Sequence, residues 1–486
     1  MPENSAAKCK EAFALPREKG EQLPPMRARC KARSRYHGGL FMDQFEEAIK
    51  LRNLYRALKK CCAGTMWKDG TAVYRSDGLE NSARLRADLK AGRYKIQRYM
   101  RFSITRPKPR SITATRIRDR HAQRSACDNI LYPILTRSFI HDNGACQIGK
   151  GVDFAIERMK YWLRRVYRAQ RRERARAAGC RVEDVGPFQA DALIYKGDVR
   201  KYFPTSRFSV AKATLRKAVA SDRLAAFFCA VVESFGEEWW EARLIAVGAP
   251  TPAAAKAARA ITDARVERES LPLRPEGERD GILRERERQI AQAVRRTPGL
   301  SQEDRAAIMD EALHGDGRGI GLGSQISQLV QLAQLNAVDH YAKEEARVAV
   351  YARYMDDFIL YDPDPERLRR AVRGIAERLD ALGLELNPKS QFIRLRKGFI
   401  FLRWHFRLTP TGKVILRAAP GIAAAEKRRL KRMGRRVAAG NADLDSLRRH
   451  YAGWRAHMAC GNTRELLRSM DKWFAAILDD IKGGIQ

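Results

Sequence analysis

Residues 353–361 read Arg-Tyr-Met-Asp-Asp-Phe-Ile-Leu-Tyr, with two adjacent aspartates between apolar, β-prone flanks. Val348–Ala352 precede the pair, and Phe358–Tyr361 follow it. Two such runs joined by a short polar connection predict a β-hairpin with carboxylates at its tip. Adjacent carboxylates repel each other, and a divalent cation offsets that repulsion. An ordinary polar turn has the same local sequence, so other parts of the chain must distinguish the two interpretations.

The composition points to a polyanionic partner. The 486 residues include 94 Lys and Arg against 57 Asp and Glu, which gives a formal net charge of +37. An imbalance of this sign and size favours nucleic acid, with an anionic membrane surface as the alternative. Because the sequence has no apolar run of about 18 residues, we expect no membrane span. The length allows roughly two to four structural units of about 150 residues each.

The cysteines and the first residues indicate a cytoplasmic protein. The nine cysteines are scattered, and apart from the adjacent Cys61 and Cys62 they show none of the paired Cys-x-x-Cys spacing of a zinc site. We therefore expect reduced thiols, as is typical of cytosolic proteins. Met1–Ser5 lead into charged sequence without the apolar core of a signal peptide.

The periodicity of apolar residues predicts a mixture of helices and antiparallel strands, an α+β protein. Helix-like spacing begins at Phe45 and Ile49, and period-two alternation marks a hairpin with a basic turn over residues 101–118. A short strand is expected over residues 192–199 and a sheet over residues 390–417. Helices are expected over residues 41–100, 119–178, 208–245, 324–345 and 366–383, and from residue 422 onward.

Residues 250–315 differ in composition from their surroundings. They are rich in Ala, Arg and Glu and poor in aromatic residues, and they contain the charged run Arg284–Arg288. This composition predicts either an inserted helical subdomain or a mobile charged arm. Residues 1–40 are polar and basic, and we interpret them as a flexible arm.

Asp198 is a third acidic candidate because it ends the strand predicted over residues 192–199. If the fold brings it beside Asp356 and Asp357, the three carboxylates can hold two Mg²⁺ ions about 3.5–4 Å apart, with Mn²⁺ as a substitute. One metal would activate a primer 3′-hydroxyl, and the other would neutralise a triphosphate and its leaving pyrophosphate. A turn or helix-capping aspartate is the alternative interpretation of Asp198.

Several short motifs accompany the three aspartates in order along the chain. They are Arg106–Ile112, Arg118–Gln123, Gly144–Gly151, Asp198–Pro204, Gly321–Gln328, Tyr354–Asp357, Leu386–Ser390 and Phe401–Phe406. Together they resemble the ordered motifs of prokaryotic reverse transcriptases, which are RNA-directed DNA polymerases. The resemblance covers roughly residues 85–220 and 316–410, with a thumb-like match beyond.

The resemblance implies roles for the residues around the aspartates. Asp198, Asp356 and Asp357 match the catalytic metal ligands of the family, and Val199 would add only its backbone carbonyl. Phe203 lies where the family places an aromatic residue that crowds a ribose 2′-hydroxyl and so favours deoxynucleotides. A buried core phenylalanine would look the same in sequence.

Basic residues complete the implied nucleotide site. Lys108 and Arg110 match the fingers hairpin that grips the incoming triphosphate, and both side chains suit phosphate oxygens. Lys389 is a candidate general acid for pyrophosphate. Phe401–Phe406 resembles the primer-grip turn, with Arg403 where the family often has glycine.

Three further motifs bear on the template. Arg118–Gln123 resembles a family helix that we interpret as structural, and Gly144–Gly151 resembles a fingers segment that contacts the template strand. In Gly321–Gln328 the glycines allow close backbone approach. Ser327 and Gln328 stand here in a pattern similar to that of diversity-generating retroelement enzymes, which copy template adenines with errors; some antiphage defence reverse transcriptases have related variants.

The resemblance implies a right-hand polymerase with a helical insertion. The expected parts are a basic arm and helical N-terminal region (1–94), fingers and first part of the palm (95–220), a charged helical insertion (221–315), the second part of the palm (316–410) and a basic helical thumb (411–486). The interval from Phe203 to Gly319 is longer than the compact family pattern, which leaves the subfamily open.

The implied substrates and partners are an RNA template, a DNA or RNA primer and dNTPs. Because the sequence shows no zinc-binding endonuclease motif, we also expect a dedicated non-coding RNA or accessory protein as a partner. We expect no membrane partner. Antiphage defence is the alternative role. A non-catalytic maturase-like RNA-binding protein is disfavoured by the retained Asp198, Asp356 and Asp357, and an RNA-dependent RNA polymerase by Phe203 and the Tyr-Met-Asp-Asp form.

Overall fold

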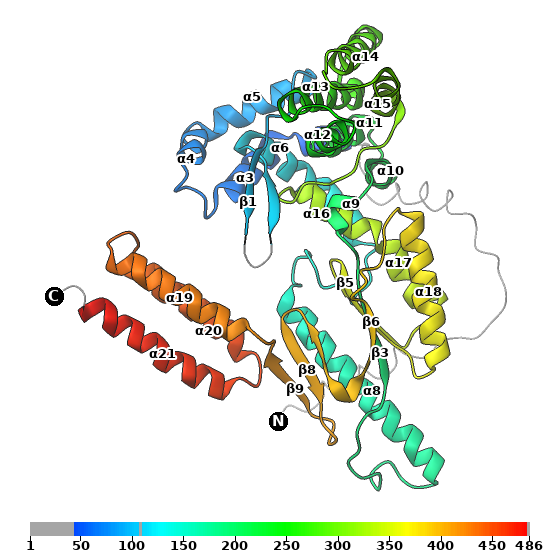
Figure 1. Ribbon diagram of the computed structural model, residues 1–486, viewed down its shortest axis with the longest axis vertical. Helices are drawn as coiled ribbons and strands as arrows, with labels where there is room; N and C mark the ends of the chain where they lie inside the picture. Colours follow the sequence, from blue (N-terminus) through cyan, green and yellow to red (C-terminus); the bar gives the residue numbers. More distant parts are fainter. Residues whose placement is uncertain (1–42, 106–108, 484–486) are drawn as a thin grey trace, which may run out of the picture. The chain divides into compact units, whose positions relative to one another are not determined.

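The computed structural model describes residues 43–105 and 109–483, so the arm predicted over residues 1–40 lies outside the described residues. Helices and small antiparallel sheets alternate along the chain, which confirms the α+β class (Figure 1). No helix in the described part of the chain is both long and apolar enough to cross a bilayer. The seven cysteines within it are all free thiols.

The first part of the chain is a helical layer with a hairpin. Its buried side chains, among them Phe45, Leu54 and Leu131, share one core with Phe228 and Val330 from later helices. The bounds are α2 Gln44–Ala48, α3 Leu51–Cys62, α4 Asp69–Ser76, α5 Gly78–Lys90, β1 Met100–Ile104, β2 Arg110–Ala114, α6 Ile117–Ala126, α7 Tyr132–Thr136, α10 Phe208–Ala218, α11 Asp222–Glu233 and α16 Gln325–Gln334.

Two of the predicted helices are shorter than expected. Helix α5 ends at Lys90, and residues 93–99 are neither helix nor strand where the sequence predicted helix to residue 100. The helix expected over residues 119–178 is interrupted by residues 137–151, and only α8, Val152–Ala178, continues it. The interruption contains Gly144, Gly149 and Gly151, and Gly149 has a φ of +76°, which a helix does not accommodate.

A four-stranded antiparallel sheet has the strand order β4-β5-β3-β6. Tyr195, Tyr351 and Phe358 pack on one face with helices α17 and α18, whereas Ile194 and Ile359 pack on the other with α8. Burial on both faces explains why these strands read as nearly continuous apolar runs. The bounds are β3 Leu193–Asp198, β4 Val350–Tyr354, β5 Asp357–Tyr361, β6 Gln391–Arg394, α9 Tyr202–Thr205, α17 Asn336–His340 and α18 Pro365–Ala381.

A three-stranded sheet and three helices follow, of which α19 is strongly basic. Trp404 is fully buried in the core that joins this sheet to α8. The Asn462 amide donates to the Leu416 carbonyl at 2.7 Å, which ties the helices to the sheet. The bounds are β7 Phe399–Phe401, β8 Trp404–Leu408, β9 Val414–Ala418, α19 Ile422–Ala438, α20 Leu444–Ala459 and α21 Arg464–Gly483.

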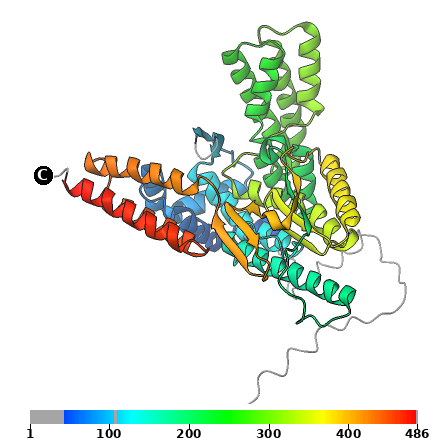
Figure 2. The same ribbon diagram turned by 60° about the horizontal axis from the view of Figure 1, so that its bottom comes forward.

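Residues 251–314 fold as helices with their own core. Trp240, Ile261, Ile290 and Ile308 are fully buried within it, and alanines such as Ala258 allow close helix packing. Figure 2 shows these helices, in green, side by side as one bundle. The bounds are α12 Glu237–Ala246, α13 Thr251–Glu269, α14 Arg279–Arg295 and α15 Gln302–His314.

The segment 118–123 has the buried polar contacts of a structural element. On α6, the Asp119 carboxylate accepts from the Tyr94 hydroxyl at 2.6 Å and from the Gln97 amide at 2.8 Å. The buried His121 ring bonds the Leu54 carbonyl through Nε2 at 2.8 Å. Burial raises the pKa of Asp119 to about 6 and lowers the pKa of His121 to about 4.

His121 makes the stability of the fold depend on pH. Its pKa lies near 6.5 when unfolded and near 4 when folded, so the unfolded chain takes up a proton first as pH falls. The free energy of unfolding should therefore drop by about 2–3 kcal/mol between pH 7 and pH 4.5 on account of this ring. His121→Asn removes that dependence but keeps Asp119. Urea unfolding of both proteins at several pH values should show their difference shrinking toward acid; a constant difference would contradict the assignment.

Candidate active site

The structure brings the three predicted aspartates to one end of the four-stranded sheet. Asp198 at the end of β3 is the register partner of Asp357 at the start of β5. Register partners project to the same face of a sheet, so these two carboxylates are neighbours. Asp356 lies in the turn, and its carbonyl accepts a hydrogen bond from the Val199 amide at 3.3 Å. All three aspartate side chains are half-buried.

The hairpin between β4 and β5 turns in two residues. Tyr354 pairs with Asp357, so Met355 and Asp356 form the whole connection. Met355 has a φ of +56°, in the left-handed region that two-residue hairpins need and that β-carbon-bearing residues rarely adopt. The tightness of this turn fixes where Asp356 and Asp357 stand relative to the strands.

A buried ion pair holds that turn. Arg353 and Asp339 are at most 1% exposed, and two guanidinium nitrogens of Arg353 contact the two carboxylate oxygens at 2.6 Å each. A third nitrogen, Nη1, donates to the Met355 carbonyl at 2.9 Å, and Nη2 also donates to the Leu332 carbonyl. Tyr351 donates its hydroxyl to Asp339 at 2.7 Å. Burial opposes the charge of Arg353, but Asp339 outweighs it and raises the pKa of Arg353.

A second support holds Asp198. The Asn387 side chain donates to the Asp198 carboxylate at 2.6 Å, and the Asn387 amide donates to the Asp198 carbonyl at 2.7 Å. Ser390 Oγ accepts from the Asp198 amide at 3.1 Å. The turn containing Lys389 is therefore fastened to the catalytic strand, while Lys389 itself is exposed.

Close packing behind the aspartates requires a glycine in β3. A β-carbon at Gly197 would lie 2.2 Å from Phe358 Cζ. Phe358 is itself buried between Tyr195 and Tyr351 and has no room to withdraw. Glycine thus lets the two strands that carry Asp198 and Asp357 approach with an aromatic ring beneath them.

The donor set suits a hard divalent cation, because carboxylate and carbonyl oxygens are the ligands that Mg²⁺ prefers. Among the described residues, however, no three His, Cys, Asp or Glu side chains are gathered at metal-binding distance. The Asp198 carboxylate is instead hydrogen-bonded to Asn387. Asp198, Asp356, Asp357 and the Val199 carbonyl remain the predicted ligands.

Residues 143–146, which belong to the predicted template motif and its flank, contact helix α16 and the β4–β5 hairpin. Asn143 bridges Arg353 alongside β4, and the Gly144 amide donates to the Arg353 carbonyl at 3.0 Å. Cys146 Sγ lies 4.0 Å from Gln328 Oε1 and 3.8 Å from Met355 Sδ. The structure therefore brings the predicted template motif, Gln328 and the catalytic hairpin together.

The β7–β8 turn lies across a pocket from the catalytic hairpin. Leu402 and Arg403 have φ values of +50° and +68°, the pattern of a type I′ turn. Arg403 thus adopts a left-handed conformation that favours glycine, the residue that reverse transcriptases often have at the matching position of the primer-grip turn. The pocket has a volume of about 520 Å³ and is lined by residues 354–357 and 402–403 together with Lys196.

Two further predicted residues, Phe203 and Arg110, lie on other segments of the described chain. Phe203 is half-buried on α9, packed against the cluster that contains Val199 and Tyr202. Arg110 is exposed at the start of β2. Lys108 lies outside the described residues. The base of the β1–β2 hairpin reaches the glycine motif through the Thr113 amide, which donates to the Leu322 carbonyl at 3.0 Å.

The sequence analysis missed four residues that hold the site. Arg353 and Asp339 support the turn, and Asn387 and Ser390 support Asp198. An arginine inside an otherwise apolar strand was the available signal for the first pair, because a charge there needs a buried partner.

No protein-family model matches the chain. No curated protein matches its sequence. Among solved structures, telomerase from Candida albicans in complex with a TWJ fragment of telomeric RNA is similar over 80% of this chain, at 11% sequence identity and a TM-score of 0.35. The match covers 56% of the telomerase chain, so this chain spans little more than half of it. A likeness of this degree carries no argument about activity, which has to rest on the site geometry.

The Arg353–Asp339 pair gives a stability prediction. Arg353→Ala leaves Asp339 buried without a counter-charge and should lower the free energy of unfolding by about 3–5 kcal/mol. Arg353→Met/Asp339→Asn removes both charges and keeps an acceptor for Tyr351, so it should recover at least half of that loss.

Urea unfolding of the three proteins measures both effects. Arg369→Ala is the matched control, because Arg369 pairs with Glu366 on the exposed face of α18. It should change stability by less than about 0.5 kcal/mol. If the double variant were as unstable as Arg353→Ala, uncompensated charge would not be the cause.

Proposed function

We propose that the protein is an RNA-directed DNA polymerase of right-hand architecture that makes cDNA by two-metal nucleotidyl transfer. The observation that carries the proposal is the register pairing of Asp198 with Asp357, with Asp356 in the adjoining two-residue turn. This arrangement places three carboxylates at one sheet end, and Asp356 and Asp357 line a pocket shared with the β7–β8 turn. Two-metal phosphoryl transfer needs such a group of oxygen ligands.

In this proposal Asp198, Asp356, Asp357 and the Val199 carbonyl hold two Mg²⁺ ions, or Mn²⁺ in their place. The bound ions would supply activation of the primer hydroxyl and neutralisation of phosphate charge. Asn387 keeps the Asp198 carboxylate oriented by its hydrogen bond. The Arg353 contact to the Met355 carbonyl keeps the turn from shifting.

Other residues would handle the substrates. Lys108 and Arg110 on the β1–β2 hairpin would grip the triphosphate, and Lys389 would protonate the leaving pyrophosphate. Phe203 would crowd a 2′-hydroxyl. The basic helix α19 exposes Arg428, Arg429 and neighbouring cations, which suits the backbone of a template–primer duplex.

We further propose error-prone copying of the diversity-generating type. Its support is the Ser327-Gln328 pattern and the position of Gln328 beside Cys146, which in turn lies beside Met355 of the β4–β5 turn. The alternative role is antiphage defence, which would use the same chemistry. In either role a dedicated RNA or accessory protein would select the template.

Removing the catalytic aspartates tests the reaction. Asp356→Ala/Asp357→Ala should lower dNTP incorporation on a primed RNA with Mg²⁺ by at least about a hundredfold, because about 2.7 kcal/mol of transition-state stabilisation corresponds to that ratio. Asp479→Ala/Asp480→Ala is the matched control, an exposed adjacent pair on α21. Equal activity of the Asp356→Ala/Asp357→Ala variant and wild type would overturn the proposed mechanism, and absence of incorporation by both would favour a non-catalytic RNA-binding protein.

Phe203 gives a separate test of sugar selection. Phe203→Ala should raise the ratio of ribonucleotide to deoxynucleotide incorporation by about tenfold, since about 1.4 kcal/mol of steric discrimination would be lost. Phe203→Tyr keeps the ring and should keep the ratio near that of wild type. Single-nucleotide extension with matched rNTP and dNTP measures it. An unchanged ratio in Phe203→Ala would assign this side chain to the core alone.

A further inference from the structure

A second basic cavity lies away from the aspartates. It has a volume of about 870 Å³ and is bounded by α10, α11, the end of α13, the start of α14 and the segment 313–315. Six cationic side chains and three carboxylates line it. The cationic residues are Lys212, Arg216, Arg223, Arg265, Arg268 and Arg279.

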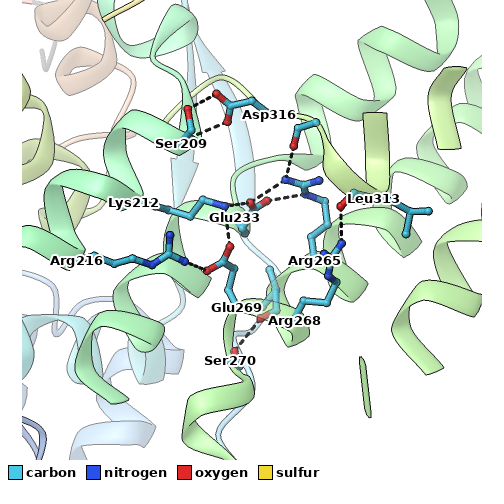
Figure 3. A network of polar contacts seen from close by, with 12 residues as sticks. Ser209, Lys212, Arg216, Glu233, Arg265, Arg268, Glu269, Ser270, Leu313 and Asp316 are labelled. Carbon is cyan, nitrogen blue, oxygen red and sulfur yellow. Dashed lines mark hydrogen bonds and ion pairs between the residues drawn. The ribbon is translucent and has the colours of Figure 1, made fainter. Parts of the chain in front are cut away.

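Two of the three carboxylates are already neutralised by the protein. Lys212 donates to Glu233 at 2.6 Å and to Glu269 at 2.7 Å, and Arg265 contacts both oxygens of Glu233 at 3.0 Å (Figure 3). Arg216 donates to the other Glu269 oxygen at 2.6 Å. Burial would raise the pKa of Glu233, but Arg265 and Lys212 outweigh it and hold that pKa below its usual value. The three cations of this network neutralise both carboxylates and hold them in place.

Two arginines remain in surplus. Arg268 Nη1 donates to the Leu313 carbonyl at 2.8 Å, and Arg279 Nε donates to the Arg274 carbonyl at 3.2 Å. Within residues 44–105 and 109–481, no carboxylate lies within 4 Å of either guanidinium. Both side chains are half-buried, so the missing counter-charge is not replaced by full hydration. Both guanidinium groups line the same cavity, and each has the charge and the N–H donors to bind phosphate oxygens.

The rest of the cavity wall combines apolar side chains with His314 and the third carboxylate, Asp222, which is exposed. Leu271, Pro272, Leu283 and Leu313 line it together with Val219. Leu283 follows Arg279 by one helical turn on α14, so the two share a face of that helix. A ligand that packs against these apolar side chains and also pairs with both arginines has a flat or apolar body and more than one anionic group.

We propose that this cavity binds a nucleoside di- or triphosphate, with its phosphates on Arg268 and Arg279 and its base against Leu271, Pro272 and Leu283. The site is separate from the aspartates and does not depend on the polymerase proposal. An RNA strand is the competing ligand in so basic a chain. A concave pocket with an apolar wall favours a compact molecule over an extended backbone, which would contact open, solvent-facing cations.

Nucleotide binding to the full chain in EDTA tests the proposal, because chelation removes the metal that a polymerase site needs for its triphosphate. The probes are ATP, GTP, ADP, inorganic phosphate and a 20-nucleotide RNA, titrated by calorimetry. At least one of the three nucleotides should bind at least tenfold more tightly than inorganic phosphate. Arg268→Gln/Arg279→Gln should weaken that binding at least tenfold.

The matched control is Arg284→Gln/Arg288→Gln, which removes two exposed arginines from the same helix and should stay within twofold of wild type. Leu283→Trp fills the cavity from its apolar side with both arginines retained, and it should weaken binding as well. This variant decides the matter if the double arginine variant does not fold. The proposal would be overturned if no nucleotide bound, or if the control variant lost as much affinity as Arg268→Gln/Arg279→Gln. It would also be overturned if RNA binding fell in Arg268→Gln/Arg279→Gln and nucleotide did not compete with the RNA.

Discussion

The bidentate ion pair between Arg353 and Asp339 is the constraint on which the site depends. It links a sheet strand to helix α17, and the same guanidinium reaches the carbonyls of Leu332 in α16 and Met355 in the turn. A buried pair of this kind adds little net stability over an apolar pair of the same size. Its contribution is to define a single arrangement, since any shift of the turn would leave a buried donor unsatisfied.

The consequence reaches both aspartates of the hairpin. Met355 is held at a positive φ without being glycine, a conformation that persists only where the surroundings fix it. The Arg353 contact to its carbonyl supplies that constraint directly. The turn then sets Asp357 in register with Asp198. The positions of Asp356 and Asp357 therefore depend on a contact made by the buried side chain of Arg353.

The sequence pattern predicted where several strands lie, but local pattern alone did not predict which strands pair with each other. The hairpin at residues 350–361 was predictable because strands buried on both faces carry a continuous apolar signal. The pairing of Asp198 with Asp357 joins strands far apart in the chain, and its register is set by which side chains each face buries. Motif order implied that pairing, whereas local pattern alone did not.

The insertion shows why charge-rich sequence is hard to interpret. Arg284–Arg288 alternates sign and is equally typical of a solvated arm and of a helix face. What fixes these helices is the buried core around Ile261 and Ile290 together with ion pairs such as Arg265 to Glu233. Arg265 and Glu233 are distant in sequence and lie on different helices. Their burial as an ion pair therefore becomes evident only from the packing of these helices in the fold.

Glu233 and Asp198 are hydrogen-bonded by opposite kinds of partner, cationic for Glu233 and neutral for Asp198. Glu233 is matched by the cations Lys212 and Arg265, which cancel its charge and leave it structural. Asp198 is held by a neutral amide, Asn387, and no Lys or Arg of the described residues lies within 4 Å of its carboxylate. A neutral donor orients a carboxylate without compensating it, so the negative potential stays available to a cation from solution. In a chain of charge +37 with arginine abundant, the support of Asp198 by an amide is consistent with the cation-binding role that we propose for it.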